Sequence, residues 1–274
     1  MHLRLAILLD LKSLSKDSMI TIKKQNEIEI MRVAGSITAG ALDEISKHIK
    51  PGISTLELDK IAEKFIIDKG AKPAFLRYNG FPNSICSSID DVVVHGIPRK
   101  DIILQEGQII GIDVGAKYKG YSGDAARTFA VGKVSEDKQK LIEVTKECFF
   151  RAIKNLKAGS RLGDIGFEVQ SYAEKYGFEP VRQMGGHGIG RNMHEDPFIP
   201  MYGRAGTGIK LEAGMTLAIE PMINMGTYDI EINGWDVRTA DGLPSAHYEN
   251  TVLIKEDGVE ILTKTADLEA NNLE

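Results

Sequence analysis

The chain has 274 residues, and its 34 Lys and Arg residues against 39 Asp and Glu residues give a formal net charge of −5. This balance provides no strong basic field, so nucleic acid and anionic membranes are not expected as main partners. Two cysteines, Cys86 and Cys148, are too few for a disulfide framework and are typical of a chain in a reducing compartment, which predicts a cytoplasmic protein.

The N-terminal segment contains a short apolar run at residues 5–9. Asp10 and Lys12 interrupt this run before it reaches the length of a secretory signal core, and no small-residue cleavage site follows. We therefore expect residues 1–18 to be an optional leader and residues 19–274 to form one domain. No other stretch approaches the roughly 20 apolar residues that a transmembrane helix requires.

An internal repeat organises the chain, because the sequence aligns with itself at a fixed offset that places Ala34 against Leu141 and continues without a gap. Each half contains apolar stripes that predict two consecutive amphipathic helices. These helices are expected around residues 34–49, 58–70, 141–156 and 165–177. Ser54 and Glu57 form a capping box before the second of them, and glycine closes the second helix of each half.

Short apolar, β-branched runs around the helices predict strands. They cover residues 85–89, 91–94, 109–114, 215–219 and 251–254. Because the order helix, helix, strands occurs twice, we predict an α/β (α+β) fold of two halves related by an approximate two-fold axis. The sheets of the halves are joined in this prediction, and the helices lie on the outer face. Coincidence between two amphipathic helix pairs is the alternative on pattern alone.

Four acidic residues enter or flank the predicted strands. Asp113 lies inside an apolar strand, where an unpaired buried charge is strongly unfavourable. Asp124 follows it at a distance that suits a hairpin turn and a returning strand, although a lone Asp here is more often a turn residue. Glu220 stands at the repeat-related position of Asp113, so both halves carry a carboxylate at the same place, and Glu249 enters a further apolar strand.

His187 adds a nitrogen ligand to this acidic set. A lone histidine is more often structural, but glycines on both sides of His187 allow the backbone to bring its imidazole close to other groups. Shared cations explain the four acids better than four separate ion pairs do. An oxygen-rich set with one imidazole suits a pair of divalent ions, and Mn, Fe, Co and Zn are all chemically admissible.

Two divalent ions a few ångström apart can hold a bridging water as hydroxide and polarise a neighbouring carbonyl. This is the chemistry of peptide or ester hydrolysis. A free N-terminal amine at a further metal position would make such an enzyme an aminopeptidase.

The surrounding motifs identify a family. In order along the chain they are His95-Gly-Ile-Pro, Ile112-Asp-Val, Gly123-Asp, Gly186-His-Gly-Ile-Gly, His194-Glu, Ile219-Glu-Pro-Met, Gly234-Trp and Tyr248-Glu-Asn-Thr. On these motifs, residues 19–263 resemble the type I methionine aminopeptidases. The resemblance implies the pita-bread fold that this family shares with proline-specific aminopeptidases and creatinase, with a joined antiparallel sheet and a single catalytic domain over residues 19–274.

The resemblance also implies a role for each candidate ligand. Asp113 would chelate one metal ion, Asp124 and Glu249 would bridge both ions, and His187 with Glu220 would complete the second site. The cofactor would be two divalent metal ions per chain, with Co, Mn, Fe and Zn left open.

Substrate contacts follow from the same resemblance. His95 and His194 would contact the substrate backbone or steady the developing oxyanion, and Glu220 or the metal-bound hydroxide would transfer protons. Without the resemblance, a structural hydrogen bond is an equal interpretation of His194. An apolar, polarizable pocket would hold the methionine side chain, although core packing is the commoner role of such residues. The residues expected to line this pocket are Tyr78, Phe81, Cys86, Met193 and Trp235.

The short form of the family fits this chain, because His187 and Glu220 stand close in sequence and leave no room for the helical insertion of type II enzymes. The resemblance implies hydrolytic removal of the initiator methionine from nascent proteins and peptides with a small second residue, and it leaves ribosome association open. The alternatives are a proline-specific or creatinase-like hydrolase and a catalytically silent binding protein. Silent relatives lose metal ligands, and the ligands are present here.

Overall fold

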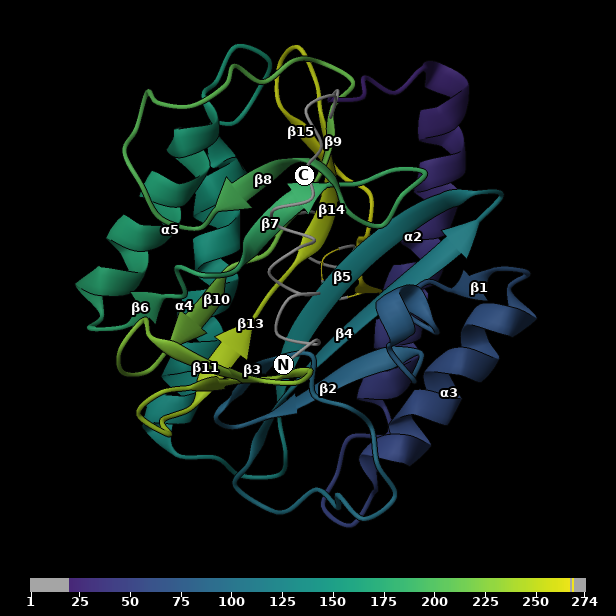
Figure 1. Ribbon diagram of the computed structural model, residues 1–274, viewed down its shortest axis with the longest axis vertical. Coiled ribbons are helices and arrows are strands. Elements are labelled where there is room, and N and C mark those ends of the chain that lie inside the picture. The colour runs from purple at the N-terminus through teal and green to yellow at the C-terminus, as the bar shows by residue number, and fades with distance from the viewer. Residues whose placement is uncertain (1–19, 267, 269–274) are drawn as a thin grey trace.

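The computed structural model describes residues 20–266 and residue 268, so the expected leader at residues 1–18 lies outside the described residues. Two helix pairs frame the fold in Figure 1, one pair beside each half of the sheet region. The helices are α2 (Gln25–Ser46), α3 (Thr55–Asp68), α4 (Glu136–Lys154) and α5 (Leu162–Lys175). All four predicted helices are confirmed, and the first begins earlier in the chain than its apolar stripe indicated.

The start of each second helix is fixed by local hydrogen bonds. The predicted capping box before α3 is present, because the Ser54 side chain accepts from the backbone N–H of Glu57 and the Glu57 carboxylate accepts from the backbone N–H of Ser54. At the corresponding place before α5, the Asp164 carboxylate accepts from the backbone N–H of Arg161. Glycine follows each of the two helices with a positive φ, a region that favours this residue, at Gly70 (74°) and Gly177 (78°).

The longest strands form a hairpin in the first half. β4 (Ile109–Tyr118) and β5 (Tyr121–Ala130) are joined by Lys119 and Gly120, both with positive φ, as a two-residue type I′ turn requires. With β1 (Lys72–Pro73) and β2 (Ile85–Ile89) they make a four-stranded sheet. This sheet packs on α2 and α3 through an apolar cluster that includes Leu42, Leu58 and Ile112.

The second half contains a five-stranded sheet and takes part in two smaller ones. The five-stranded sheet has the order β15-β14-β9-β7-β8, and the strand pairings in the described part of the chain are antiparallel. Two three-stranded sheets have the orders β13-β10-β6 and β11-β12-β3. The bounds are β3 (Val92–Val94), β6 (Glu179–Pro180), β7 (Gly185–Gly188), β8 (Glu195–Pro200), β9 (Thr216–Ile219), β10 (Met222–Asn224), β11 (Ile230–Asn233), β12 (Asp236–Thr239), β13 (Ser245–His247), β14 (Asn250–Ile254) and β15 (Val259–Ile261), and a short 3-10 helix, η1 (Tyr78–Gly80), precedes β2.

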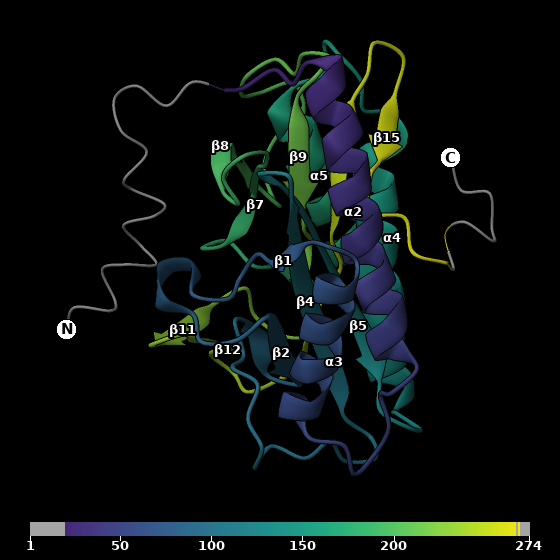
Figure 2. The same ribbon diagram turned by 90° about the vertical axis from the view of Figure 1, so that its right-hand side faces the viewer.

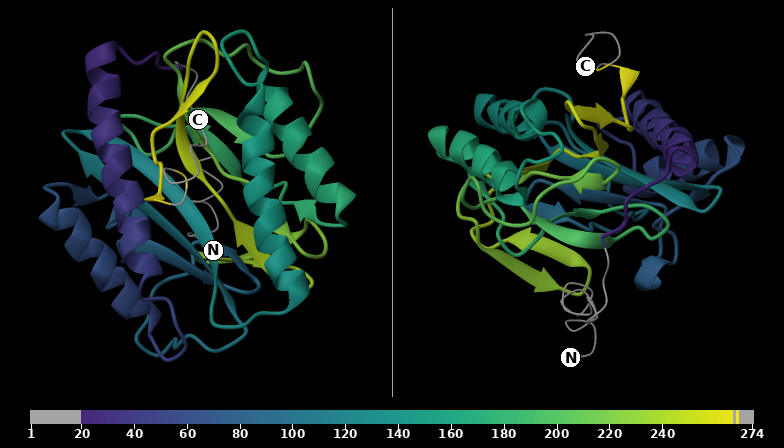
Figure 3. Two further views of the ribbon diagram at one scale, coloured as in Figure 1. Left: turned by 180° about the vertical axis from the view of Figure 1, so that it is seen from behind. Right: turned by 90° about the horizontal axis from the view of Figure 1, so that it is seen from above.

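The sheets of the two halves meet along one line. The backbone N–H of Glu249 donates to the carbonyl of Ala126 at 2.9 Å, and the N–H of Ala126 donates back to the carbonyl of Glu249 at 3.4 Å. β5 therefore lies beside the segment that leads into β14. Figures 2 and 3 show the helices on one face of this joined layer, while β7, β8, β11 and β12 lie toward the other face. The predicted α/β fold with joined sheets and outer helices is confirmed.

None of the helices within the described ranges is long and apolar enough to cross a membrane.

Candidate metal centre

The five predicted ligands come from three strands and two strand ends around the line where the halves meet. Asp113 lies on β4 and Asp124 on β5, and the register pairs Asp113 with Ala126, so the two acids are diagonal neighbours on one face. His187 lies on β7, and Glu220 directly follows β9.

Glu249 directly precedes β14 and lies opposite Glu220. The β9–β14 register pairs Ile219 with Asn250, and the hydrogen bond from the N–H of Tyr248 to the carbonyl of Pro221 extends the same pairing by two residues. Glu220 and Glu249 of the second half therefore lie opposite one another, and the backbone hydrogen bonds between Glu249 and Ala126 bring Glu249 beside β5 of the first half.

Distances between side chains define one compact cluster. The Nε2 atom of His187 lies 3.8 Å from Oδ2 of Asp124 and 3.6 Å from Oε1 of Glu220. One donor atom each from Asp124, His187 and Glu249 lie within 4.8 Å of one another, and the same holds for Asp113, His247 and Glu249. The structure thus brings all five predicted ligands together, and Glu249 belongs to both groups.

The packed carboxylates raise one another's affinity for protons. Burial raises the pKa of Asp113 well above its ordinary value, and repulsion from Asp124 and Glu220 adds to this effect. Burial likewise raises the pKa of Asp124 to about 7 and the pKa values of Glu220 and Glu249 well above their usual range. A bound cation would reverse these shifts, because it stabilises the ionised carboxylates.

His187 is held in the form that can bind a metal. Its Nδ1 atom lies 2.8 Å from the backbone carbonyl of Gly188, and since a carbonyl oxygen only accepts, Nδ1 carries the proton. The Nε2 atom that faces Asp124 and Glu220 then carries a lone pair. A carbonyl partner of this kind orients many metal-binding histidines.

The donor set fits divalent cations. Oδ1 of Asp113, Oδ1 of Asp124 and Oε1 of Glu249 are buried oxygens without a hydrogen-bond partner in the described structure. A buried carboxylate oxygen without a partner is strongly unfavourable, and a cation supplies what is missing. Four carboxylates with an imidazole match the ligand preferences of Mn, Fe, Co and Zn.

Sequence reasoning did not single out His247, which also points into the cluster. Its Nε2 atom lies 3.5 Å from Oε2 of Glu220 and 3.8 Å from Oε2 of Glu249, and its side chain is 4% exposed. One signal was available, because His247 and Glu249 are two residues apart and alternate residues of an extended segment share a face.

The two predicted substrate histidines lie at the edge of the cluster. The rings of His194 and His187 are 4.3 Å apart, and Nδ1 of His194 lies 2.8 Å from the Tyr78 hydroxyl. His95 follows β3 with a positive φ of 62°, and burial lowers its pKa to about 4, so it is neutral at physiological pH. Its ring stands edge-on to Trp235, with 6.0 Å between the ring centroids.

The predicted pocket residues form one apolar cluster beside the two histidines. Phe81 and Trp235 make an edge-to-face contact at 5.2 Å between ring centroids. Cys86 is paired with Asp113 across β2 and β4, and burial raises the pKa of its thiol well above the ordinary value, which keeps that wall uncharged. The cluster brings together Tyr78, Phe81, Cys86, Met193 and Trp235.

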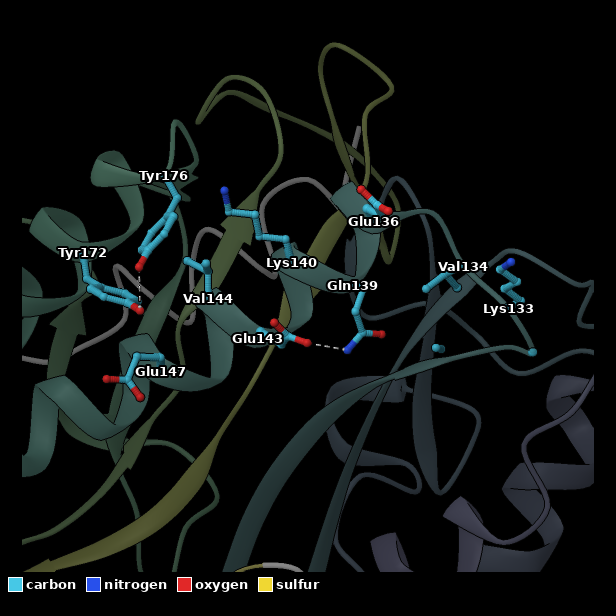
Figure 4. Close-up of a pocket in the computed structure, with 12 residues that line it drawn as sticks. Lys133, Val134, Glu136, Gln139, Lys140, Glu143, Val144, Glu147, Tyr172 and Tyr176 are labelled. Atoms are coloured by element: carbon cyan, nitrogen blue, oxygen red, sulfur yellow. Dashed lines mark hydrogen bonds between the residues drawn. The ribbon is translucent and has the colours of Figure 1, made fainter.

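A separate hollow lies against α4, away from this cluster. Figure 4 shows Glu136, Lys140 and Glu143 around it, with Tyr172 and Tyr176 at one side. Both signs of charge and the amide of a glutamine line it, as on an ordinary solvated surface, and none of the predicted site residues takes part. The chemistry of the molecule is therefore assigned to the carboxylate cluster.

Comparison with known proteins agrees with this geometry. The profile of Metallopeptidase family M24 matches residues 29–256. The chain is 53% identical to a methionine aminopeptidase of Clostridium acetobutylicum over 247 residues, covering 89% of this chain and 99% of that protein. It is 49% identical to methionine aminopeptidase 1 of Bacillus subtilis over 248 residues, covering 90% and 100% of the two chains.

Solved structures share the fold. The crystal structure of methionine aminopeptidase from Thermotoga maritima superposes with a TM-score of 0.89 at 45% identity, covering 90% of this chain and 100% of that one. Prolidase from Pyrococcus furiosus gives a TM-score of 0.73 at 28% identity, covering 94% of this chain and 67% of that one. These likenesses confirm the predicted pita-bread fold. Because the family profile matches most of this chain, the chain belongs to metallopeptidase family M24.

Proposed function

We propose that this chain is a methionyl aminopeptidase that uses two divalent metal ions to remove the initiator methionine from nascent proteins and peptides with a small second residue. The observation that carries the proposal is the convergence of four carboxylates and His187 beside an apolar pocket containing Met193 and Trp235. The names of the relatives, methionine aminopeptidases at about half identity, support the same activity.

Asp113, Asp124, His187, Glu220 and Glu249 would hold the two ions. Bound ions would supply an activated water as nucleophile and polarise the scissile carbonyl. Mn, Fe, Co and Zn are all compatible with the donor set.

The chain's own groups then handle protons and orientation. We assign proton transfer between the attacking water and the leaving amine to Glu220, whose carboxylate would be ionised beside bound cations. His95 is partly buried and neutral, and we assign it to a hydrogen bond with the substrate backbone. Tyr78 holds His194 through its hydroxyl, which orients the second substrate-contacting imidazole beside His187.

The pocket provides selectivity for an unbranched thioether. Phe81 and Trp235 form one aromatic wall, and Cys86 and Met193 add polarizable sulfur surface. Gly115 keeps room beside Met193, because a Cβ atom at Gly115 would lie 2.6 Å from the Met193 methyl carbon.

We place the activity in the cytoplasm, where nascent chains carry their initiator methionine. Both cysteines are free and buried, as expected for a chain in a reducing compartment. We also propose residues 19–274 as a single catalytic domain, since the family match spans both halves of the repeat.

Peptide hydrolysis tests the proposal. The purified chain, freed of metal and reloaded separately with Mn, Co, Fe or Zn, is offered Met-Ala-Ser and Met-Lys-Ser. We expect release of methionine from Met-Ala-Ser at a kcat/KM at least about 100-fold above that for Met-Lys-Ser, since a large second residue displaces the scissile bond. Absence of turnover of Met-Ala-Ser with all four metals would contradict the proposal.

A third peptide, Ala-Pro-Ala, distinguishes methionine removal from the alternative activity, proline-directed hydrolysis. The prolidase from Pyrococcus furiosus has the same fold, so the same metals could serve a proline-directed hydrolase. Cleavage of Ala-Pro-Ala without cleavage of Met-Ala-Ser would assign the chain to that activity.

A further inference from the structure

His247 is an imidazole of the cluster for which the proposed function has no use. It lies at the end of β13, and its Nε2 atom is buried without a hydrogen-bond partner among the described residues. Two carboxylate oxygens lie near it, Oε2 of Glu220 at 3.5 Å and Oε2 of Glu249 at 3.8 Å. A buried nitrogen that faces two carboxylates calls for a specific role.

The two oxygens of Glu220 face two different imidazoles. Oε1 lies 3.6 Å from Nε2 of His187, and Oε2 lies 3.5 Å from Nε2 of His247. The first imidazole is fixed by Gly188 with its lone pair toward the cluster, as a metal ligand requires. The Nε2 atom of the second imidazole has no hydrogen-bond partner among the described residues, so a proton on it would meet only the two carboxylates.

Electrostatics favours the proton on that atom. A lone pair on Nε2 of His247 would face the lone pairs of Glu220 and Glu249, which is repulsive, whereas an N–H there faces two acceptors. The 3.5 Å separation from Glu220 is about 0.5 Å longer than an ordinary N–H···O bond. The hydrogen bond therefore requires the Glu220 carboxyl group to turn toward His247.

We propose that His247 is a positioning residue whose Nε2–H group donates to Oε2 of Glu220 and leaves Oε1 directed at the ion site beside His187. This inference rests on the proposed function, because it concerns the metal centre of that activity. In this arrangement Glu220 would bind the ion through Oε1 alone. A carboxylate bound through one oxygen can rotate, and the contact of Oε2 with His247 would prevent that rotation.

A competing arrangement has His247 as a direct ligand. Asp113, His247 and Glu249 offer donor atoms within 4.8 Å of one another, so one ion could bind all three. The two arrangements differ in the number of imidazoles bound to metal, one in the positioning role and two in the ligand role.

Two substitutions test the proposal on the full chain. His247→Gln keeps a neutral N–H donor at a similar distance from the backbone, and His247→Leu removes it. His48→Leu is the control, because His48 lies just after α2 with its side chain 43% exposed. Binding of Co2+ to metal-free protein is measured by calorimetry, and the imidazoles around bound Co2+ are counted by X-ray absorption.

We expect His247→Leu to weaken Co2+ binding about 10- to 100-fold, the usual effect of removing a group that orients a ligand. His247→Gln should stay within about threefold of the unaltered chain, as should His48→Leu. X-ray absorption should show one imidazole for each pair of Co2+ ions in both the unaltered chain and His247→Gln.

Two results would overturn the inference. Co2+ binding by His247→Leu at the affinity of the unaltered chain would remove any positioning role. Two imidazoles for each pair of ions, falling to one in His247→Gln, would make His247 a ligand. The imidazole count on the unaltered chain decides between the roles even if His247→Leu does not fold. Failure of Met-Ala-Ser hydrolysis would reject the proposed function, while the Co2+ affinities would still decide the role of His247.

Discussion

The acidic side chains at the centre of the molecule lower the stability of the metal-free protein. Asp113, Asp124, Glu220 and Glu249 lie close together in a largely buried place, and each has a raised pKa. Ionisation of these groups without a cation is unfavourable, so the native state keeps protons that the unfolded chain releases. Metal binding and stability are therefore coupled at this site.

This coupling predicts how the stability of the metal-free protein depends on pH. The pKa of Asp124 is about 7 in the native state against 3.8 ordinarily, so between these values the native state binds more protons than the unfolded state. The free energy of unfolding should therefore fall as pH rises from about 4 to about 7. Urea unfolding in EDTA at pH 5, 6 and 7 measures it. A steady increase of stability over that range would contradict the prediction.

Removal of one bridging acid should separate activity from stability. Asp124→Asn would take away a proposed metal ligand, and we expect kcat/KM for Met-Ala-Ser to fall at least about 1,000-fold in the presence of added metal. The metal-free variant should unfold at a urea concentration equal to or above that of the unaltered chain, because one source of repulsion is gone. Asp137→Asn, in the exposed first turn of α4, is the control and should change neither quantity. Retained hydrolysis in Asp124→Asn would mean that the ligand assignment is wrong.

The acids could be recognised in the sequence because carboxylates are unusual in apolar strands. The spacing of Asp113 and Asp124 predicted a hairpin, and the structure has it with a two-residue turn. His247 could not be assigned in the same way, because its direction depends on the approach of Glu220 from the end of β9, a distant strand. A histidine in an apolar segment is otherwise typical of a core position.

At the scale of elements, helix α2 approaches the β4–β5 hairpin closely through glycine. A Cβ atom added at Gly123 on β5 would lie 2.9 Å from the backbone of Gly35 on α2. Backbone atoms cannot move aside as the end of a side chain can, so the contact between helix and strand requires glycine at this position.

Gly123→Ala should therefore destabilise the chain by about 1–3 kcal/mol, the usual cost of overpacking. Gly111→Ala on β4 is the matched control, because its nearest neighbours would lie at 3.6 Å, an ordinary contact distance. We expect that control to change stability by less than about 1 kcal/mol. Urea unfolding of both variants in EDTA gives the comparison, and equal effects of the two substitutions would contradict the account of this contact.

The elements that the sequence predicted are those with strong local patterns. The capping box of Ser54 and the glycines at Gly70 and Gly177 mark helix ends by local chemistry, so their positions agree with the structure. The two-residue strands β1 and β6 were not predicted, because they are stabilised by pairing with the distant strands β4 and β10. The hairpin of β11 and β12 was not predicted either, although its two strands are neighbours in sequence and pair with each other.

At the scale of the whole molecule, the two halves repeat the same local structures. Gly52 and its repeat-related partner Gly159 have φ of 93° and 95°. The isolated bridge of Ser54 with Ile103 likewise recurs at the corresponding positions of the second half, as Arg161 with Lys210. The candidate metal centre lies where the halves meet, so its geometry depends on the junction between them.

Arg127 holds this junction together. Its guanidinium is buried, donates to the carbonyls of Ala126 and Glu249 and to the side chain of Asn250, and stacks over Tyr248. No salt bridge to it is found among residues 20–266 and 268. Its contribution is therefore to donate hydrogen bonds to oxygens of both halves at the junction.

Arg127→Met should remove the hydrogen bonds of the guanidinium, while the backbone hydrogen bonds between Ala126 and Glu249 remain. We expect this loss to destabilise the chain by at least about 2 kcal/mol. The exposed Arg99, paired with Asp101 on the surface, provides the control Arg99→Met, which should leave the unfolding temperature nearly unchanged. Calorimetric unfolding of the metal-free variants measures both. Equal stability of Arg127→Met and the unaltered chain would show that the junction does not depend on this side chain.

The central claim is that Asp113, Asp124, His187, Glu220 and Glu249 together hold two divalent ions. Anomalous diffraction from crystals grown with Mn2+ tests it most directly. We predict two peaks about 3.5 Å apart among these side chains, with Asp124 and Glu249 touching both. Mn2+ peaks elsewhere, or none among these five side chains at saturating Mn2+, would contradict the account.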